Sequence, residues 1–551
     1  MTATGSRASA YVGPGVLALG LAALLSVCRG PAEAAPAPAA DDGRASGAAL
    51  YATYCAECHG ARLEGARGPS LLEARWRDGQ GAATLSVAIR QGVPARGMPG
   101  FEGVLPEAAL VALADHVFAQ NLQGLVDGRR GSPAVAVGSE PATPRPNTAL
   151  RSLLHAFRIS TLVADGLRQP KSLAILPDGD LLVTDAAGLR RAGAPGWVLG
   201  GAVQGLPEYD VLEEVAAHPE YPSNGWLYLT SVCSAACGHP DRHVYSLFRG
   251  RIRDGRWVDG STLATYGDGD ASYGVSKLAF DGAGYLWLSL SGAERPGQDP
   301  DAFAADIERP ASLKSHRGKI FRLRDDGAVP SDGPFADQQF ADRRITNEST
   351  GHGTVSLAPA AVWSLGHRGL SGLHYDRHTR TLWATEHGPW GGDELNRIVR
   401  GGDYGWPRTS YGYHYGGALL EHAALPGLEA PVFHWTPSAG VSGVLVYRGD
   451  AFPQWRGDLF VGALGDRIGR TLYRFRLVDG QARLYEYPTD ADGRVQRDAA
   501  GHALPRVARF EEVAADIGRI RDLREGPDGL IYLLLENPDR ILRLEPAEEP
   551  P

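Results

Sequence analysis

Several kinds of residue and segment are scarce in this chain of 551 residues. It has no basic run, and a net charge of −9 disfavours nucleic acid as a partner, because a phosphate backbone is bound by clustered Lys and Arg. It has no apolar run long enough to span a bilayer, so we expect no transmembrane segment in the mature chain. Glycine (71) and proline (38) exceed their usual levels but together stay below the share typical of a disordered chain, which suits a turn-rich β protein.

The N-terminus has the pattern of an export signal. Arg7 gives a positive start, residues 16–27 are almost continuously apolar, and residues 31–40 offer small-residue cleavage sites. We therefore expect residues 1–40 to be a signal peptide and small-residue tail, and the protein to be periplasmic or secreted. A lipid anchor at Cys28 is the alternative, although Val27 is larger than the residue that usually precedes such a cysteine.

Only five cysteines occur, and two of them lie four residues apart at Cys233 and Cys237. In an oxidising compartment we expect this pair to form a disulfide. A metal site with the nearby His239 and His243 is the alternative.

Residues 41–121 have a helical pattern, with candidate helices at 47–54, 82–90 and 106–118. A stretch rich in Pro, Gly and Ala follows over residues 122–154 and reads as an interdomain linker. The N-terminal part is therefore predicted to be a small all-α domain.

This helical segment contains Cys55-Ala-Glu-Cys58-His59, the attachment sequence of c-type haem. Its spacing lets the two thiols form thioethers with the haem vinyl groups while His59 binds the iron. A redox dithiol beside an uninvolved histidine is the alternative.

The small number of methionines indicates which residue is the second axial ligand of the haem iron. The chain has two methionines, and Met1 leaves with the signal, so Met98 is the thioether that remains. A His/Met pair closes both axial positions and suits electron transfer; a gap-filling core methionine is the alternative. The segment resembles a class I cytochrome c, in which the carbonyl of the proline corresponding to Pro69 orients the proximal histidine.

The remainder of the chain repeats one phrase: an apolar strand, a turn with Pro, Asp or Gly, and a second apolar strand. The six copies lie at residues 173–183, 215–229, 278–288, 373–383, 445–461 and 523–533. Such a repeat predicts an all-β six-bladed β-propeller over residues 155–547, with a tail at 548–551. Strands near residues 157–163 and 540–544 are expected to pair in one blade and close the ring.

Polar groups concentrate at residues 385–396 and 403–407, where carboxylates lie beside glycine carbonyls. Such hard oxygen ligands suit Ca²⁺, although a polar loop capping a blade would have a similar composition. Near the C-terminus, Arg519 and Arg521 are one residue apart on a predicted strand, so they share a face and suit a polycarboxylate.

From about Phe157 to Pro546 the chain resembles the soluble PQQ-dependent sugar dehydrogenases, of the aldose dehydrogenase type of glucose/sorbosone dehydrogenase. The matching motifs lie at residues 315–320, 326–330, 365–368, 386–389, 391–396, 404–407, 449–453 and 519–521. The resemblance implies a propeller that holds pyrroloquinoline quinone (PQQ) and Ca²⁺ on one face.

By position, the resemblance implies that Arg368, Arg519 and Arg521 pair with the PQQ carboxylates and quinone oxygens, and that Tyr415 lines its ring. It implies that carbonyls of Gly388 and Pro389 bind the Ca²⁺ that polarises PQQ. It further implies that Glu394 and Tyr404 hold a second, structural Ca²⁺.

The chain departs from the family where the general base is expected, because Tyr273 stands in place of a histidine. An aspartate partner falls at Gly292, a PQQ-contacting glutamine at Tyr209, and an asparagine at Gly369. Tyrosine with a pKa of about 10 is a poor base at neutral pH, so Asp268 or Asp270 is a candidate substitute.

These features predict a periplasmic quinohaemoprotein oxidoreductase. PQQ with Ca²⁺ would oxidise a sugar or related alcohol, and the fused haem c would pass the electrons to a downstream respiratory acceptor. The alternatives are an electron-transfer cytochrome fused to a catalytically degenerate propeller that acts as a binding or sensing module, and PQQ oxidation of another substrate with another base.

Overall fold

The structure is a computed structural model. Between residues 47 and 117 it describes residues 47–68, 71, 89, 92, 98–101, 103–106, 109–110, 113 and 116–117. Beyond these it describes 149–152, 154–234, 236–237, 243–266, 275–292, 309–337, 357, 359–389, 391–412, 426–435, 438–465, 470–478, 481–482, 511–515 and 517–547.

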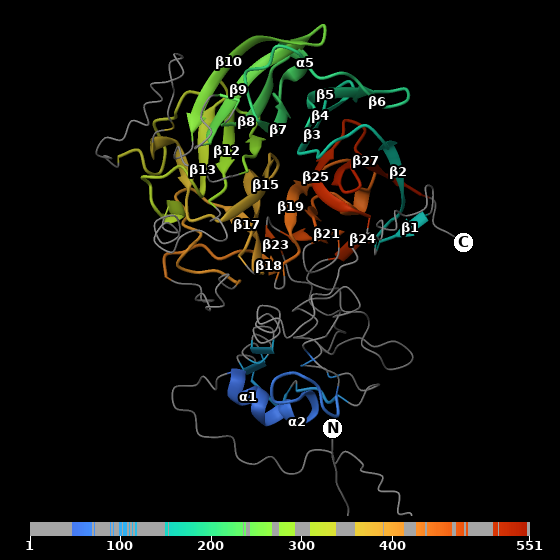
Figure 1. The fold of residues 1–551 in the computed structure, drawn as a ribbon, viewed down its shortest axis with the longest axis vertical. Coiled ribbons are helices and arrows are strands. Elements are labelled where there is room, and N and C mark those ends of the chain that lie inside the picture. Colours follow the sequence, from blue (N-terminus) through green and yellow to red (C-terminus); the bar gives the residue numbers. More distant parts are fainter. Residues whose placement is uncertain are drawn as a thin grey trace, which may run out of the picture.

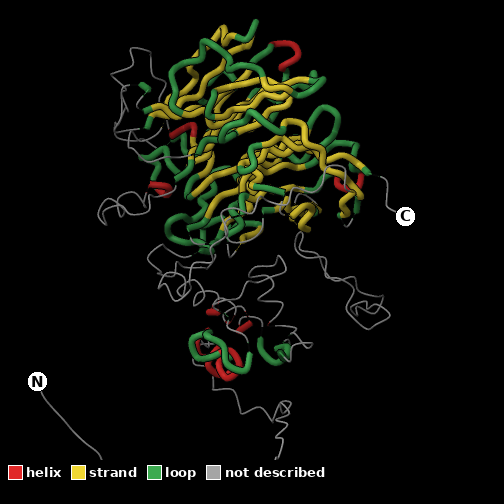
Figure 2. Tube along the Cα trace, turned by 45° about the vertical axis from the view of Figure 1, so that its right-hand side comes forward, coloured by secondary structure: helices red, strands yellow, loops and turns green. Residues whose placement is uncertain are grey.

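The described part of residues 149–547 forms six antiparallel sheets arranged as the blades of a propeller (Figures 1 and 2). Three blades are β3 (Ser172–Ile175), β4 (Leu181–Asp185), β5 (Gly188–Gly193) and β6 (Val198–Leu199); β7 (Val211–Ala217), β8 (Leu227–Cys233), β9 (Val244–Arg253) and β10 (Arg256–Tyr266); and β11 (Leu278–Phe280), β12 (Tyr285–Leu290), β13 (Lys319–Arg324) and β14 (Val362–Ser364).

The next two blades are β15 (Gly369–Asp376), β16 (Thr381–His387), β17 (Asp393–Ile398) and β18 (Phe433–Trp435); and β19 (Val441–Val446), β20 (Leu459–Ala463), β21 (Thr471–Phe475) and β24 (Glu511–Ala515). The last is β25 (Arg519–Glu525), β26 (Ile531–Glu536), β27 (Arg540–Pro546), β2 (Ala156–Val163) and β1 (Ala149–Arg151). Short elements complete the description: β22 (Leu477–Val478), β23 (Gln481–Ala482), α5 (Tyr221–Asn224), η2 (Arg309–Ala311), η3 (Pro359–Ala361) and η4 (Pro453–Trp455).

The six-bladed propeller predicted from the sequence is confirmed, and each repeated phrase forms the first hairpin of one blade. In the first phrase, for example, Leu173 pairs with Val183 across the β3–β4 ladder, and both side chains are fully buried. Runs of Leu, Val and Ile form these strands because branched side chains pack well on a pleated surface that is buried between neighbouring blades.

Both ends of the propeller segment meet in one blade, as expected. Strand β2 pairs with β27 from Phe157↔Pro546 to Val163↔Ile541, so the ring has no open end there. A buried cluster seals this junction, and Phe157, Trp455 and Leu533 are among its members. Strand β1 corrects the domain boundary, because residues 149–151 lie within the expected linker yet pair with β2.

Ring closure brings the first strands of the six blades together. Strand β3 contacts β7 and β25, β15 contacts β11 and β19, and the contacts β7–β11 and β19–β25 complete the circle. Since these six strands run in the same sense relative to the axis, their N-terminal ends converge at one end of the propeller.

The described N-terminal residues include two short helices, α1 (Gly47–Tyr54) and α2 (Ala56–His59), separated by Cys55. An apolar cluster surrounds them, with Tyr51, Leu63 and Leu113 almost fully buried. Helix α1 agrees with the expected helix at 47–54, whereas most of the segments expected to be helical at 82–90 and 106–118 lie outside the described residues.

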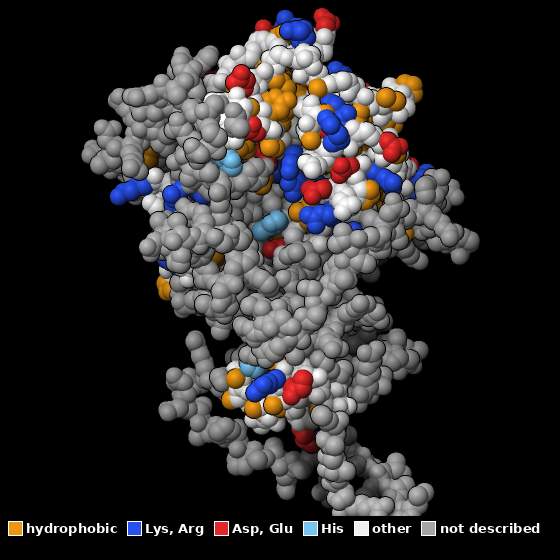
Figure 3. Space-filling view, in the orientation of Figure 1, with side chains coloured by type: hydrophobic (Ala, Val, Ile, Leu, Met, Phe, Trp, Pro, Cys, Tyr) orange, Lys and Arg blue, Asp and Glu red, His pale blue; other side chains and the backbone are white. Residues whose placement is uncertain are grey.

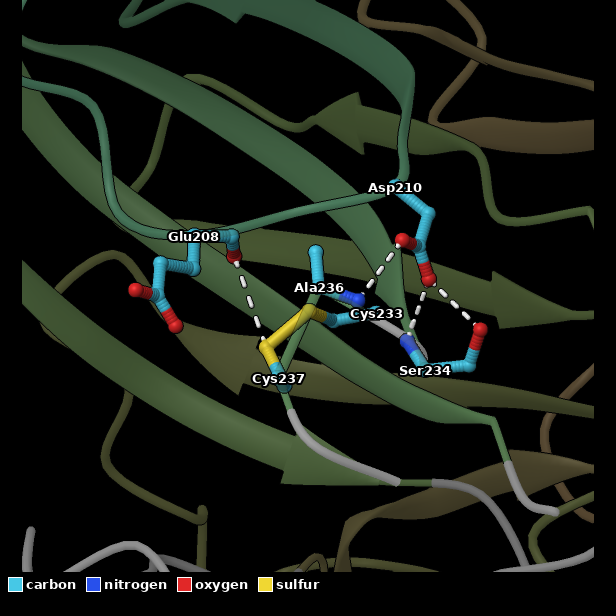
Figure 4. The surroundings of a disulfide bond; sticks show 6 residues. All are labelled: Glu208, Asp210, Cys233, Ser234, Ala236 and Cys237. Carbon is cyan, nitrogen blue, oxygen red and sulfur yellow. Dashed lines mark hydrogen bonds between the residues drawn. A yellow bond between two sulfur atoms is a disulfide. The ribbon is translucent and has the colours of Figure 1, made fainter. Parts of the chain in front are cut away.

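Cys233 and Cys237 form a disulfide, with their sulfur atoms 1.97 Å apart (Figure 4). The Asp210 carboxylate holds the loop between them, accepting hydrogen bonds from the backbone N–H groups of Ser234 and Ala236. Because Asp210 directly precedes β7, these hydrogen bonds hold the loop after β8 beside the start of β7.

No helix within the described residues is long and apolar enough to cross a membrane. Several predicted features lie outside the described residues: the expected signal peptide with Cys28, most of the expected linker, Pro69, the 548–551 tail, and the candidate site residues Asp268, Asp270, Tyr273 and Tyr415.

A buried charge cluster in the fifth blade gives a test of the fold. Arg474 is 1% exposed and pairs with Asp458 and Glu511, its Nε lying 2.6 Å from the Glu511 carboxylate. Arg474→Gln removes the buried cation that pairs with both carboxylates, so we expect the free energy of unfolding to fall by about 3–5 kcal/mol. Urea denaturation followed by tryptophan fluorescence measures this loss.

Arg456→Gln is the matched control, because Arg456 and its partner Asp450 are 58% and 87% exposed. Such an exposed pair contributes about 0–1 kcal/mol. An equal fall in the free energy of unfolding of the two variants would contradict the stabilising role assigned to the buried charge cluster.

Candidate functional site

A cavity of about 280 Å³ opens where the six first strands converge. Each blade contributes to its wall, at or just before the start of its first strand. The lining residues are Lys171, Glu213, Val275, Lys277, Ser291, Arg368, Gly369, Leu370, Ser371, His387, Ser442, Leu464 and Arg521. The cavity therefore lies on the axis of the propeller.

Irregular strand pairing turns several of these side chains toward the axis. One extra residue interrupts the ladder between Leu212 and Glu214, between Leu370 and Gly372, and between Ile520 and Asp522. The extra residues are Glu213, Ser371 and Arg521, and all three line the cavity. The β19–β20 ladder is shifted at Ser442 and Gly443, and Ser442 lines the cavity too. Bulges re-aim side chains in this way beside many active sites.

The cavity wall carries more positive than negative charge. Lys171, Lys277, Arg368 and Arg521 line it, whereas Glu213 is the single carboxylate among the lining residues that the structure describes. Burial lowers the pKa of Lys171, and Arg521 lowers it further. In Figure 3, basic side chains lie beside acidic ones on the displayed face of the propeller. The cavity thus has the electrostatics of a site for an anion with several carboxylates.

Arg368 is held rigidly at this wall. Its backbone N–H donates to the Glu386 carboxylate at 2.7 Å, and its Nη1 donates to the carbonyls of His387 at 3.0 Å and Gly388 at 2.6 Å. Its guanidinium also lies 5.3 Å from the ring centre of Trp406. The Gly388 carbonyl predicted to bind Ca²⁺ therefore faces a cation already.

Arg519 and Arg521 share one carboxylate, as their Nε atoms lie 3.7 Å and 3.5 Å from Glu536. Arg519 Nη1 also donates to the carbonyl of Leu464 at 3.1 Å, and Leu464 is a cavity residue. Arg521 itself lines the cavity, so the structure brings Arg368 and Arg521 to one site and places Arg519 behind its wall.

Two carboxylates predicted near Ca²⁺ are crowded together behind the cavity. Glu386 and Glu394 are direct cross-strand partners, an unfavourable arrangement for like charges. Burial, followed by the charge of Glu386, raises the pKa of Glu394 well above its usual range. Asn396 Nδ2 donates to both, at 2.6 Å to Glu386 and 3.0 Å to Glu394.

The amide oxygen of the same Asn396 is buried and has no hydrogen-bond partner among the described residues. A hard oxygen without a partner, beside crowded carboxylates, is the donor set that Ca²⁺ prefers. The described residues contain no cluster of three or more His, Cys, Asp or Glu side chains that would hold a metal ion. A cation here would therefore need backbone carbonyl or amide oxygens to complete its ligands.

Tyr404 packs on the same network from the other side. Its ring stacks on His367 at 4.4 Å, and His367 Nδ1 lies 3.0 Å from Glu386. The Tyr404 hydroxyl donates to the carbonyl of Arg397 at 2.5 Å and accepts from the N–H of Val399. Since the backbone engages this hydroxyl, any contribution of Tyr404 to a metal site would come from its carbonyl.

Two departures from the family pattern are enforced by packing. A Cβ at Gly292 would lie 2.8 Å from the backbone of Gly318 and from the carbonyl of His367. A Cβ at Gly369 would lie 2.9 Å from the carbonyl of His387. Neither position has room for an Asp or Asn side chain in this structure.

The haem motif has a geometry suited to its predicted role. Cys55 and Cys58 are not bonded to each other, and the backbone N–H of Cys58 donates to the carbonyl of Cys55 in a tight turn. Burial raises the pKa of the Cys55 thiol to about 11, contrary to the low pKa of a redox dithiol.

The two predicted axial ligands are both among the described residues. His59 is 9% exposed, and a Cβ at Gly68 would lie 3.1 Å from its ring, so a glycine lets the chain pass close behind it. Met98 is partly buried. These donors, beside the apolar cluster that contains Cys55, fit a covalently bound haem.

Sequence reasoning missed Lys171, Glu213, Lys277 and His387 as cavity residues. One signal was available for Glu213: two consecutive glutamates interrupt the apolar run of residues 211–217. Successive side chains of a regular strand point to opposite faces, so only one of the two glutamates could face the axis. Two adjacent glutamates in an apolar run therefore indicate a bulge at this point of the strand.

Two family models match the chain: glucose / sorbosone dehydrogenase over residues 167–543, and cytochrome C oxidase, cbb3-type, subunit III over residues 43–117. The aldose sugar dehydrogenase YliI of Escherichia coli is 30% identical over 399 residues, which cover 70% of this chain and 92% of that protein. An uncharacterized protein of Synechocystis sp. is 31% identical over 405 residues, covering 70% and 85%.

Among solved structures, the soluble aldose sugar dehydrogenase of Escherichia coli in its apo-form is similar with a TM-score of 0.54 and 28% identity, covering 71% of this chain and all of that one. The dehydrogenase model spans more than half of the 551 residues. The chain therefore belongs to the glucose / sorbosone dehydrogenase family, with a cytochrome c domain ahead of the propeller.

Proposed function

We propose that this protein is a periplasmic quinohaemoprotein dehydrogenase that oxidises a sugar with PQQ and Ca²⁺ and passes the electrons to its own haem c. The observation that carries the proposal is the axial cavity, in which Arg368 and Arg521 meet Lys171 and Lys277. The family relationship supports an oxidoreductase acting on a sugar, since the Escherichia coli relative is named an aldose sugar dehydrogenase.

The residues present fit PQQ, whose carboxylates require several cations. Arg368 and Arg521 would bind them from two blades, with Arg519 held against Glu536 behind the wall. When bound, PQQ supplies a two-electron acceptor for the hydride of a sugar C–H bond. The protein's own contribution is to orient it, to exclude water with the surrounding blades, and to accept the hydroxyl proton.

Ca²⁺ fits two places in this chain. The carbonyls of Gly388 and Pro389 lie at the end of β16 next to the cavity, and Ca²⁺ would need the Arg368 guanidinium to turn from the Gly388 oxygen. The crowded pair Glu386 and Glu394, with the unpartnered Asn396 oxygen, would hold a second ion that stabilises the blade.

Fusion to a haem domain gives the propeller a tethered acceptor. A tether raises the effective concentration of the haem at the propeller without any new contact. His59 and Met98 would be the protein's ligands to the haem iron, a pair that would favour electron transfer over oxygen chemistry. A respiratory acceptor would then reoxidise the haem.

The first test is haem reduction in the full-length protein with its haem attached. We expect an aldose to sharpen the visible bands of the haem only when PQQ and Ca²⁺ are both supplied. Absorption spectra recorded with each component omitted in turn measure this. If the protein binds PQQ but its haem stays oxidised with every aldose and alcohol, the propeller is a binding or sensing module instead.

The second test is the affinity for PQQ. Arg521→Gln removes a charged hydrogen-bond donor from the cavity, which we expect to weaken PQQ binding about 10- to 100-fold. Arg543→Gln is the matched control, because Arg543 lies in the same blade with a similar exposure of 24% against 21%, but on β27, two strands away from β25. Quenching of tryptophan fluorescence measures the PQQ affinity of both variants. Equal affinities in the two variants would contradict the assignment of Arg521 to the PQQ site.

The third test concerns the haem ligands. Met98→Leu removes the thioether, so we expect the haem potential to fall and the reduced haem to bind carbon monoxide, since axial ligands set potentials over a range of about 0.8 V. Val104→Ala, at an exposed position in the same segment, is the control. Redox titration and carbon monoxide difference spectra report the change; an unaltered potential would exclude Met98 as the ligand.

A further inference from the structure

Glu213 is the one carboxylate that the described cavity wall offers. It is the extra residue of the bulge in β7, it is 1% exposed, and it lines the axial cavity. Its neighbour Glu214 is also buried but is committed to ion pairs, with Lys277 Nζ at 2.7 Å and with Arg524. The bulge thus separates a structural glutamate from one that faces the cavity.

Charged groups face Glu213 from several elements. Lys171 precedes β3, Arg521 is on β25, Lys277 precedes β11, and all three cations lower the pKa of Glu213, while Glu214 beside it raises the pKa. Burial has the largest effect, and the result is a pKa above the ordinary value. Tyr266 on β10 lies within electrostatic range, and Arg368 and His387 complete the titratable cavity wall.

A second described group of the cavity wall that can accept a proton is His387. His387 Nε2 lies 2.6 Å from the carbonyl of Val441, so this nitrogen donates to the backbone. Packing leaves no room for an acidic side chain at Gly292 or Gly369. Glu213 is thus the single carboxylate among the described lining residues, where it lies beside four cations.

We propose that Glu213 is the general base of the sugar oxidation, and this rests on the proposed function. Its carboxylate takes the proton of the sugar hydroxyl as the O–H bond breaks. The hydride of the same carbon, with both electrons, would pass to bound PQQ as the C–H bond breaks and the C=O bond forms. The proton stays on Glu213 until it exchanges with solvent. A buried carboxyl with a raised pKa is a better proton acceptor at neutral pH than an ordinary one.

Glu213→Gln tests this with little change of shape. We expect sugar-dependent haem reduction to fall about 10²- to 10⁴-fold, the range typical of a lost general base. The same variant should bind PQQ at least as tightly as the natural protein, because a negative charge has left the cavity. Turnover and cofactor affinity thus change in different ways, which a loss of folding would not produce.

The pH dependence gives a second signature. A base must be deprotonated, so kcat/KM should fall as pH drops through the raised pKa of Glu213, and this acidic limb should disappear in Glu213→Gln. Infrared titration of the protein without PQQ gives a readout independent of activity. A carboxyl band that titrates above the ordinary range of glutamate should be present in the natural protein and absent from the variant.

Chemical rescue and a neighbouring variant complete the design. Formate should restore part of the activity of Glu213→Ala, because a small carboxylate fits the space vacated. Glu214→Gln removes the same charge one residue away; we expect it to lower the melting temperature while keeping the acidic limb and the infrared band.

The outcomes separate the two proposals. Natural protein that reduces its haem with sugar, together with a Glu213→Gln variant that keeps its rate and its acidic limb, would overturn Glu213 as the base and leave the dehydrogenase function intact. Natural protein that binds PQQ but oxidises no sugar would overturn both.

Discussion

Closure of the ring is the constraint on which the other features of the propeller depend. A blade cannot bury both of its faces unless it has a neighbour on each side, and β2 supplies the missing strand by pairing with β27. Only then do the first strands of all six blades form a circle of contacts. The axial cavity follows from that circle, since the same ends of the six strands meet there and each blade contributes to one wall.

Regular strands alone would not make this cavity chemically useful, because alternation would send half of the polar side chains away from the axis. Bulges at Glu213, Ser371 and Arg521 change this by inserting one unpaired residue into each ladder. Nearby ion pairs neutralise the charges that are buried in this way. Glu214 pairs with Lys277 and Arg524. Glu536 pairs with both Arg519 and Arg521. The crowded Glu386 and Glu394 lie opposite each other on β16 and β17, where a bound cation would reduce the repulsion between them.

Much of this was predictable from sequence, for identifiable reasons. The six hairpin phrases predict the blades because local alternation and turn residues determine each hairpin, and Cys55-Ala-Glu-Cys58-His59 identifies the haem because its ligands are adjacent in the chain. Arg368 and Arg521 were found through a family motif. Lys171 and Glu213 were not, because their role depends on contacts between different blades and on a bulge that moves a side chain to the other face. The linker boundary was also wrong at residues 149–151, where pairing with β2 outweighs a turn-rich composition.

The function proposed for the propeller requires that its axial cavity binds the cofactor. A crystal structure of the protein soaked with PQQ and Ca²⁺ tests this most directly. We expect PQQ on the propeller axis, with its carboxylates in contact with Arg368 and Arg521 and its quinone within reach of a sugar whose hydroxyl faces Glu213. PQQ bound elsewhere on the protein, with the axial cavity left to water, would contradict it.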